Sequence, residues 1–412
     1  MAGCINMIKH TLTISNPNYK EDVYYTTEFN RLLLEPIGAW PNPTGAPWTK
    51  ILISRLLNLI NFSLVFFLFL CTFLYIILDA ENIHLKFIKV GPMSFTVMTM
   101  SKFCLLVIHE KDIRRCLDHI EHDWKNVKRE EDRQIMLDCA TLGRRIILIS
   151  TIFALSAVFF YRLIIPLISP KVVMGNYTFR PLGYPSAKVI IDMRKSPGNE
   201  FMIGLACFCG CIMSAITVGC CSLTTVCGLH ACGQLRILMS YMNSLVHKKE
   251  DTNDNVNDRM SNVVKQHVRI LSFVRFIEDT LRGISLVEVI GCTMNMCMLG
   301  YCLITGWKRD SLIRSLSYFP LIMSFGFNIF IFCYIGEVLA EECRKVAENI
   351  YMIDWYKLQG KSGLGLILII AMSTSSNRLT AGKFMDLSIS SFGDVMKASI
   401  AYLNMFRTIA SS

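Results

Sequence analysis

Charged side chains interrupt an apolar stretch near the C-terminal end, and these residues give the first indication of what chemistry the sequence could perform. Segment 384–409 is long enough to cross a bilayer as a helix, yet it contains Asp386, Asp394, Lys397 and Arg407. A charge exposed to hydrocarbon is costly, whereas a helix beside protein or a water-filled path tolerates one. The segment is therefore predicted to lie along a polar path through a membrane.

One face of this segment carries the candidate side chains for such a path. At helical spacing, this face holds Ala398, Tyr402, Met405 and Ile409, with Thr408 beside it. Apolar side chains can close a narrow pore because they make its hydration unfavourable. For this segment taken alone, packing of the same face against other helices is the favoured interpretation.

Three further charged residues, Lys102, Arg162 and Glu288, lie inside apolar stretches. Each must pair, face water or extend its charge to the interface, and the last is expected for Arg162, near the outer end of its stretch. Glycine-rich phosphate loops and nucleophile motifs are absent, so we expect no catalytic residue and no cofactor. The basic balance follows from membrane topology, and no nucleic acid is implied.

Cysteine is abundant, with 17 residues, but most lie in apolar segments, where cysteine behaves as a small hydrophobe. No disulfide framework is implied. Cys207, Cys209 and Cys211 are spaced by two, which points them around different sides of a helix, and no histidine lies with them. We therefore expect no metal site.

The composition, with 52% hydrophobic and 18% charged residues, is too apolar for one water-soluble core. The sequence predicts an all-α membrane protein with seven transmembrane helices. Segment 363–372 is apolar but too short to span, so it is predicted to be a buried helix that forms the first half of a split seventh helix. The predicted spans are 51–78, 85–108, 146–168, 201–228, 283–304, 316–338 and 384–409.

Basic residues are distributed unevenly between the connections. The N-terminal segment and segments 109–145, 229–282 and 339–383 hold 27 Lys and Arg residues, and the alternate connections hold 11. Because basic residues are retained on the cytoplasmic side, the N-terminus is predicted to be cytoplasmic and the C-terminus extracellular. Asn176, in an Asn-Tyr-Thr motif of a predicted outer loop, is the candidate glycosylation site.

The cytoplasmic connections read as helices that continue beyond the membrane. Within 256–282, apolar residues recur at helical spacing with charges between them. This stripe either packs against neighbouring helices of the same chain or belongs to an assembly domain shared between subunits.

Four stretches, in the right order, resemble insect odorant receptors. They are NRLLLEPIGAWP at 30–41, which is similar to the hymenopteran branch, HIEHDW at 119–124, HACGQLRIL at 230–238 and FCYIGEVLAEECRKVAENIYMIDWYKL at 332–358. The last is the most specific, and its residues that match the family signature are Cys333, Tyr334, Gly336, Glu337, Tyr351, Trp355 and Tyr356.

The resemblance implies an odorant-gated, non-selective cation channel in which a tuning subunit assembles with odorant receptor co-receptor subunits into a heterotetramer. It also implies a plasma membrane location, in the dendrites of olfactory sensory neurons. The chain does not resemble the co-receptor itself, whose second cytoplasmic connection is longer than 229–282 here.

The implied division of the chain has four parts. Residues 1–50 form a cytoplasmic N-terminal segment, and 51–338 hold helices one to six with the ligand pocket. Residues 339–383 form a cytoplasmic helical anchor with the first half of helix seven, and 384–412 hold the pore-lining second half with a short extracellular end.

The family's odorant site lies in the outer half of the membrane domain between spans two, three, four and six. Such a site for a small volatile or apolar ligand is mostly apolar, with one or two orienting polar groups. The candidates on these spans are Phe95, Met98, Ser156, Phe159, Phe160, Leu205, Phe319 and Met323.

Two alternatives stay open. A gustatory receptor, a related homotetrameric channel, usually ends with Thr-Tyr and a Gln six residues after the Tyr; here Ala401 precedes Tyr402, and Thr408 stands at the Gln position. A transporter would show an internal repeat with interrupted helices in both halves, and none is visible.

Overall fold

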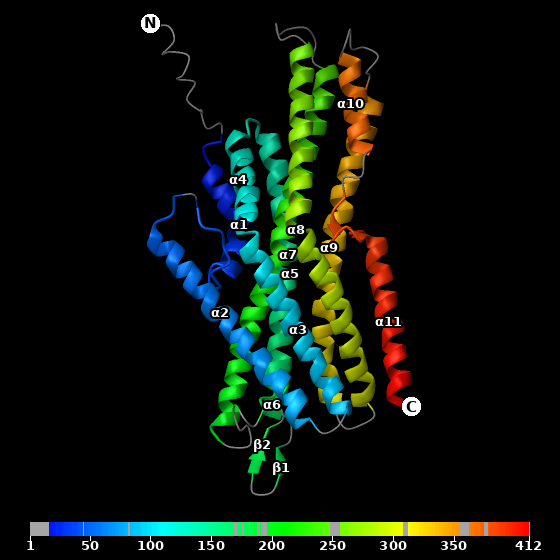
Figure 1. The fold of residues 1–412 in the computed structure, drawn as a ribbon. Coiled ribbons are helices and arrows are strands. Elements are labelled where there is room, and N and C mark those ends of the chain that lie inside the picture. The colour runs from blue at the N-terminus through cyan, green and yellow to red at the C-terminus, as the bar shows by residue number, and fades with distance from the viewer. Residues whose placement is uncertain are drawn as a thin grey trace.

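Long helices run along most of the length of the molecule in the computed structural model (Figure 1). The structure describes residues 16–43, 45–80, 83–168, 171–174, 177–180, 182–187, 190, 196–247, 256–307, 312–353, 362–374 and 378–411. Asn176, the candidate glycosylation site, and Trp355 and Tyr356 of the signature lie outside these residues.

Six helices are long and apolar enough to cross a membrane, judged by length and composition. They coincide with the first six predicted spans, and most extend well beyond them. Their bounds are α2, Trp48–Leu74, extended by a π-helical turn η1, Tyr75–Asp79; α3, Ile83–Ile108; α5, Glu130–Val158, extended by the π-helical η2, Phe159–Ile164, and by α6, Ile165–Ile168; α7, Gly198–His247; α8, Val256–Trp307; and α9, Leu312–Met352.

Shorter elements complete the described fold. The helices are α1, Tyr19–Leu34; α4, Glu110–Asn126; α10, Ser362–Thr374; and α11, Ile389–Ser411. Two antiparallel hairpins pair β1, Val172–Met174, with β2, Tyr177–Phe179, and β3, Thr380–Ala381, with β4, Met385–Asp386.

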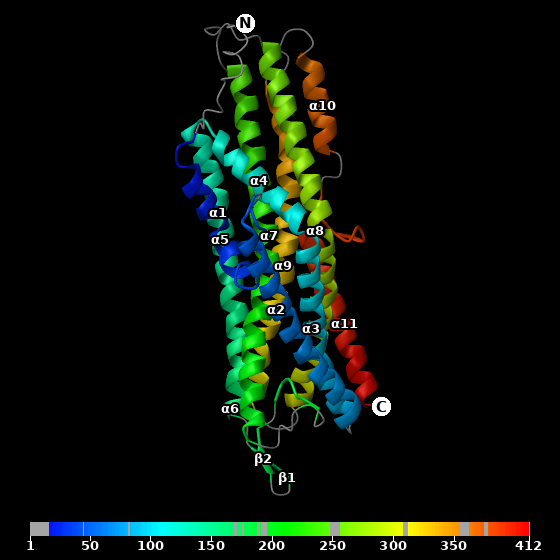
Figure 2. The same ribbon diagram turned by 60° about the vertical axis from the view of Figure 1, so that its left-hand side comes forward.

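The two ends of the bundle differ in what they carry. In both views α4, α10, the C-terminal end of α7 and the N-terminal end of α8 lie toward one end, whereas α6, the β1–β2 hairpin and the C-terminal end of α11 lie at the other (Figures 1 and 2). The connections rich in Lys and Arg thus gather at the first end. Which end of the bundle faces the cytoplasm stays a prediction.

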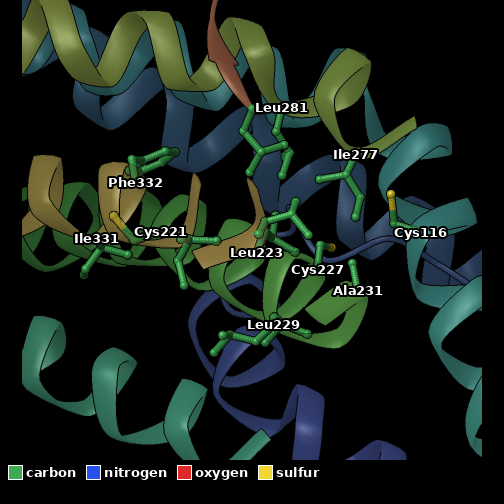
Figure 3. Close-up of a cluster of buried hydrophobic side chains, with 14 of the residues drawn as sticks. Cys116, Cys221, Leu223, Cys227, Leu229, Ala231, Ile277, Leu281, Ile331 and Phe332 are labelled. Carbon is green, nitrogen blue, oxygen red and sulfur yellow. The ribbon is translucent and has the colours of Figure 1, made fainter. Parts of the chain in front are cut away.

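Helix α7 lies at the centre and packs against α5, α8 and α9. Its small residues allow other helices to come close: a Cβ on Gly219 would lie 2.5 Å from Leu34 of α1, and one on Gly228 would lie 2.4 Å from Ile335 of α9. Cys221 and Cys227 are buried in the same core, beside Leu223, Ile277 and Phe332 (Figure 3). The described cysteines are all free thiols, as expected for cysteine used as a small apolar residue.

The predicted short helix near the C-terminus is α10, which packs against α8 and α9. Only one of its faces is buried: Leu366 and Ile369 face the bundle, while Ile367 and Leu368 are exposed. The β3–β4 hairpin separates α10 from α11, and α11 is not among the six apolar helices.

Candidate functional site

A cavity of about 60 Å³ lies inside the bundle, between α3, η2 and the end of α5, α7, α8 and α9. Small residues make the room for it, since Gly91, Ala154, Ala157 and Ser214 all line it. Apolar groups dominate the rest of the wall, as expected for a site that takes a small apolar ligand. The remaining lining residues are Pro92, Phe95, Val158, Tyr161, Arg162, Tyr184, Thr217, Asn295, Leu299, Leu321, Ser324, Phe325 and Asn328.

Arg162 is the charged residue of this wall. Its side chain is only 5% exposed, so it does not extend to the interface as its position in the sequence suggests. Its Nη1 donates to the Ala206 carbonyl at 2.7 Å, and its Nη2 donates to Tyr184 Oη at 2.9 Å. The guanidinium also stacks over the Tyr184 ring, 4.3 Å from its centroid.

Two polar features of the cavity could not be read from the sequence. Tyr184 comes from the connection between β2 and α7, which was read only as a loop, and it is buried and lines the cavity. Thr217 Oγ1 is buried without a hydrogen-bond partner within the described structure. An unsatisfied buried hydroxyl costs about 1–3 kcal/mol, so a bound molecule that accepts or donates a hydrogen bond there is favoured.

The sequence-based candidates fall into two groups. Phe95 lines the cavity, where its ring makes an edge contact with Phe325 at 5.3 Å between centroids. Met98 is buried behind the wall, with its sulfur 3.9 Å from Nδ2 of the lining residue Asn295.

The other candidates do not line this cavity. Phe159 and Phe160 are 50% and 42% exposed and contact each other on the outer surface. Phe319 and Met323 are also exposed. Ser156 donates to the Phe153 carbonyl of its own helix, and Leu205 packs on a separate small cluster around Leu68 and Met202.

Helix α11 presents two different faces. Val395 and Ser399 are buried against the bundle, where the Ser399 carbonyl accepts a bond from Cys297. Tyr402 and Met405 are 51% and 48% exposed, and Ala398 is half-buried between the two faces. The side chains of Thr408 and Ile409 lie outside the described part of the chain.

The exposed side of α11 also carries charge. Asp394 and Lys397 are both exposed and lie 3.4 Å apart at their charged atoms. Neither is covered by the rest of this chain in the described structure. A face with exposed charges, an aromatic ring and a methionine is unsuited to lipid and needs water or another polypeptide beside it.

The family signature on α9 meets the start of α11. A Cβ on Gly336 would lie 2.3 Å from the Leu387 carbonyl oxygen, so only glycine lets this backbone approach so closely. At the next residue of α9, Glu337 Oε2 accepts a hydrogen bond from the Ile389 amide at 3.2 Å. A carboxylate at a helix N-terminus is stabilising, so Glu337 helps to fix where α11 begins.

The β3–β4 hairpin holds the same junction on α8. Thr380 Oγ1 donates to Glu278 at 2.6 Å, and the Gly382 amide donates to the Arg282 carbonyl at 3.1 Å. Arg378 and Asp386 form an ion pair across the hairpin at 2.8 Å. The start of α11 is therefore tied to both α8 and α9.

Two other resembling stretches meet away from the cavity. His119 and His230 lie 3.3 Å and 2.9 Å from Asp123 Oδ2, and the guanidinium of Arg269 pairs with the other oxygen of this buried carboxylate. Burial lowers the pKa of His119 to about 4, and the nearby positive charge of Arg269 contributes to this shift to a smaller extent. Arg269 already supplies the positive charge that a metal ion would bring. We therefore interpret this cluster as a set of contacts that holds α4, α7 and α8 together.

Lys102 and Glu288 form an ion pair that is fully buried between α3 and α8. Pairing is one of the outcomes that the sequence left open for them. Removing one partner of such a pair costs about 3–5 kcal/mol because the other charge stays buried. The pair therefore fixes the position of α3, which carries Phe95, against α8.

The sequence profile of the family described as 7tm Odorant receptor matches residues 82–400. Among curated proteins, odorant receptor 13a of Drosophila melanogaster is 23% identical over 197 residues, covering 44% of this chain and 46% of that protein. Odorant receptor 82a of the same species is 24% identical over 151 residues, covering 37% and 38%. The chain thus spans less than half the length of these relatives.

Among solved structures, the insect olfactory receptor OR5 from Machilis hrabei in complex with eugenol has the same fold. The TM-score is 0.81 at 14% sequence identity, over 95% of this chain and 100% of that chain. The structure of the same receptor described without eugenol gives a TM-score of 0.77 at 13% identity, covering 94% and 99%.

Proposed function

The chain belongs to the 7tm odorant receptor family, and we propose that it is the odorant-binding subunit of a heteromeric, ligand-gated, non-selective cation channel. The observation that carries this proposal is that one helical bundle has two separate environments. A mostly apolar cavity lies inside the bundle, and a separate helix, α11, presents a polar face outside it. A ligand site and a conduction surface need these two environments.

We assign odorant binding to the cavity. A small volatile molecule would contact Phe95 and Phe325 through dispersion, while Thr217 or Asn295 orients its polar group. The solved relative named as a complex with eugenol supports a small organic ligand for this fold. Among the earlier candidates, we retain Phe95 as a direct contact and Met98 as its support.

We assign ion conduction to α11. In this proposal α10 and α11 are the two halves of a seventh helix, the N-terminus is cytoplasmic, and the C-terminus and Asn176 are extracellular. The basic connections gathered at the α4 and α10 end support this orientation. Ala398, Tyr402, Met405, Thr408 and Ile409 then face the pore.

One subunit cannot close a pore with a single helix, so this function needs other subunits. The second cytoplasmic connection here, 229–282, is shorter than that of the odorant receptor co-receptor, so we propose that this chain is a tuning subunit. Its partners in the channel are then co-receptor subunits. This role places the protein in the plasma membrane of olfactory sensory neuron dendrites.

Current recording tests the proposal. The chain is expressed alone, with the odorant receptor co-receptor, and with an empty vector beside the co-receptor, and each cell is exposed to one odour panel. Odour-specific cation current is expected only in the second case. Silence of the pair across the panel at confirmed surface expression contradicts the channel function, and robust current from the chain alone contradicts the heteromeric part.

A further inference from the structure

Arg162 brings a buried charge to the cavity wall, and none of the residues that the structure describes neutralises it. Its acceptors are the Ala206 carbonyl, the Tyr184 hydroxyl and, at 3.3 Å, the Met213 thioether, all of them uncharged. Among the residues that the structure describes, no carboxylate lies within 4 Å of this guanidinium. A buried charge without a counterion is unfavourable, and an anionic occupant would relieve it.

The surroundings of Arg162 are built to hold it there. A Cβ on Gly210 would lie 2.7 Å from Arg162 Cδ, so the absence of a side chain at Gly210 leaves space for the arginine. Tyr184, which stacks on the guanidinium, also donates to the Pro92 carbonyl at 3.3 Å and so connects Arg162 to the cavity wall on α3. The charge is thus positioned beside the cavity.

We propose that the preferred ligands of this cavity are small carboxylic acids, bound as carboxylates that accept charge-assisted hydrogen bonds from Arg162. This inference rests on the proposed odorant-receptor function and names its ligand class. The planar guanidinium can donate two parallel hydrogen bonds to the two oxygens of a carboxylate, and the opposite charges strengthen both bonds. An alcohol or an ester is uncharged and cannot form such a charge-assisted pair of bonds. The apolar remainder of the acid lies against Phe95, Val158 and Leu321.

A purely structural role for Arg162 makes a different prediction. If Arg162 only held Tyr184 and the Ala206 carbonyl in place, its loss would weaken the response to all ligands alike. Selection of an acid over an uncharged molecule of the same size separates the two roles.

The experiment compares isomers in the complete channel, formed with the odorant receptor co-receptor. Hexanoic acid and methyl pentanoate have the same atoms, as do 3-phenylpropanoic acid and methyl phenylacetate, and only the acids ionise. Dose-response curves are recorded for the wild type, for Arg162→Gln and Arg162→Lys, and for Arg180→Gln. Arg180 is the matched control because it bonds to the Leu167 carbonyl outside the cavity.

The wild type is expected to respond at lower concentration to at least one acid than to its ester. Arg162→Gln should lower acid potency at least tenfold, equivalent to about 1.4 kcal/mol, while ester potency changes less than threefold. Arg162→Lys should keep part of the acid response, and Arg180→Gln should keep all of it.

Two results overturn the inference. One is a wild-type channel that answers other odorants but prefers neither acid over its ester. The other is an Arg162→Gln channel whose potency falls equally for acids and esters. A channel that answers no odorant at all, at normal surface expression, counts against the proposed function instead.

Discussion

At the scale of single residues, the size of a side chain decides where the cavity lies. Gly91, Ala154 and Ala157 leave space, whereas the aromatic pair Phe159 and Phe160 occupies the outer surface. The sequence analysis included these phenylalanines because they are apolar and lie on the third predicted span, one of the spans that line the family's odorant site. Lipid suits them equally, and the helical spacing of Ala154, Ala157 and Tyr161 marks the inner face better.

This difference gives a paired prediction. Phe95→Ala should lower agonist potency about tenfold, because the ring forms part of the cavity wall and its loss removes contacts to a small ligand. Phe159→Ala is the matched control, since the same atoms are removed from a ring that is half exposed outside the cavity. Dose-response curves at equal surface expression measure both. Equal shifts for the two variants would place the ligand elsewhere.

At the scale of elements, the junction between α9 and α11 is one of the contacts through which the bundle positions the exposed helix. Gly336 and Glu337 bring the backbone of α9 against Leu387 and the first turn of α11. Their place in the family signature is therefore explained by packing as well as by resemblance. The sequence could not give this contact, because residues 336 and 387 are far apart in the chain.

Gly336→Ala tests this junction. Its Cβ would meet a backbone oxygen at 2.3 Å, so the start of α11 must move, and we expect the maximal odour-evoked current to fall severalfold with little change in potency. Gly326→Ala is the control on the same helix, because nothing lies within 4 Å of its added Cβ. Maximal current and surface labelling are measured together. Equal currents in the two variants at equal labelling would show that this contact does not position the conducting helix.

At the scale of the whole molecule, apolar segment length predicted the six long helices, because that signal is local and strong. The charges of segment 384–409 likewise marked α11 as different from the others. The sequence analysis expected a ligand site between spans two, three, four and six, and the observed cavity is lined by the helices of these spans, by α8 and by a loop, a combination that no local pattern indicates. Lys102 and Arg162 show the limit most clearly: the sequence required each charge to be satisfied, but only the packed bundle identifies Glu288 and Tyr184 as neighbours.

The last prediction concerns the gate, which belongs to the assembled channel. Tyr402 and Met405 are exposed on α11, whereas Val395 and Ser399 pack against the bundle, so the exposed face can contact water or other subunits. If apolar side chains close the pore by excluding water, Met405→Ser should ease its wetting and raise the current without odorant.

Ile409→Ser, in the turn that follows, should act in the same direction as Met405→Ser, and co-receptor subunits, which supply the other gate residues, will reduce both effects. Ile400→Ser is the control, because Ile400 is also exposed but lies nearly half a turn around the helix from Met405. The measurement is basal current relative to the odour-evoked maximum, with cation permeability ratios, at matched expression. Wild-type ratios in both gate variants would mean that this face of α11 does not line the pore, whereas a rise confined to Ile400→Ser would place the pore on the face that carries Ile400.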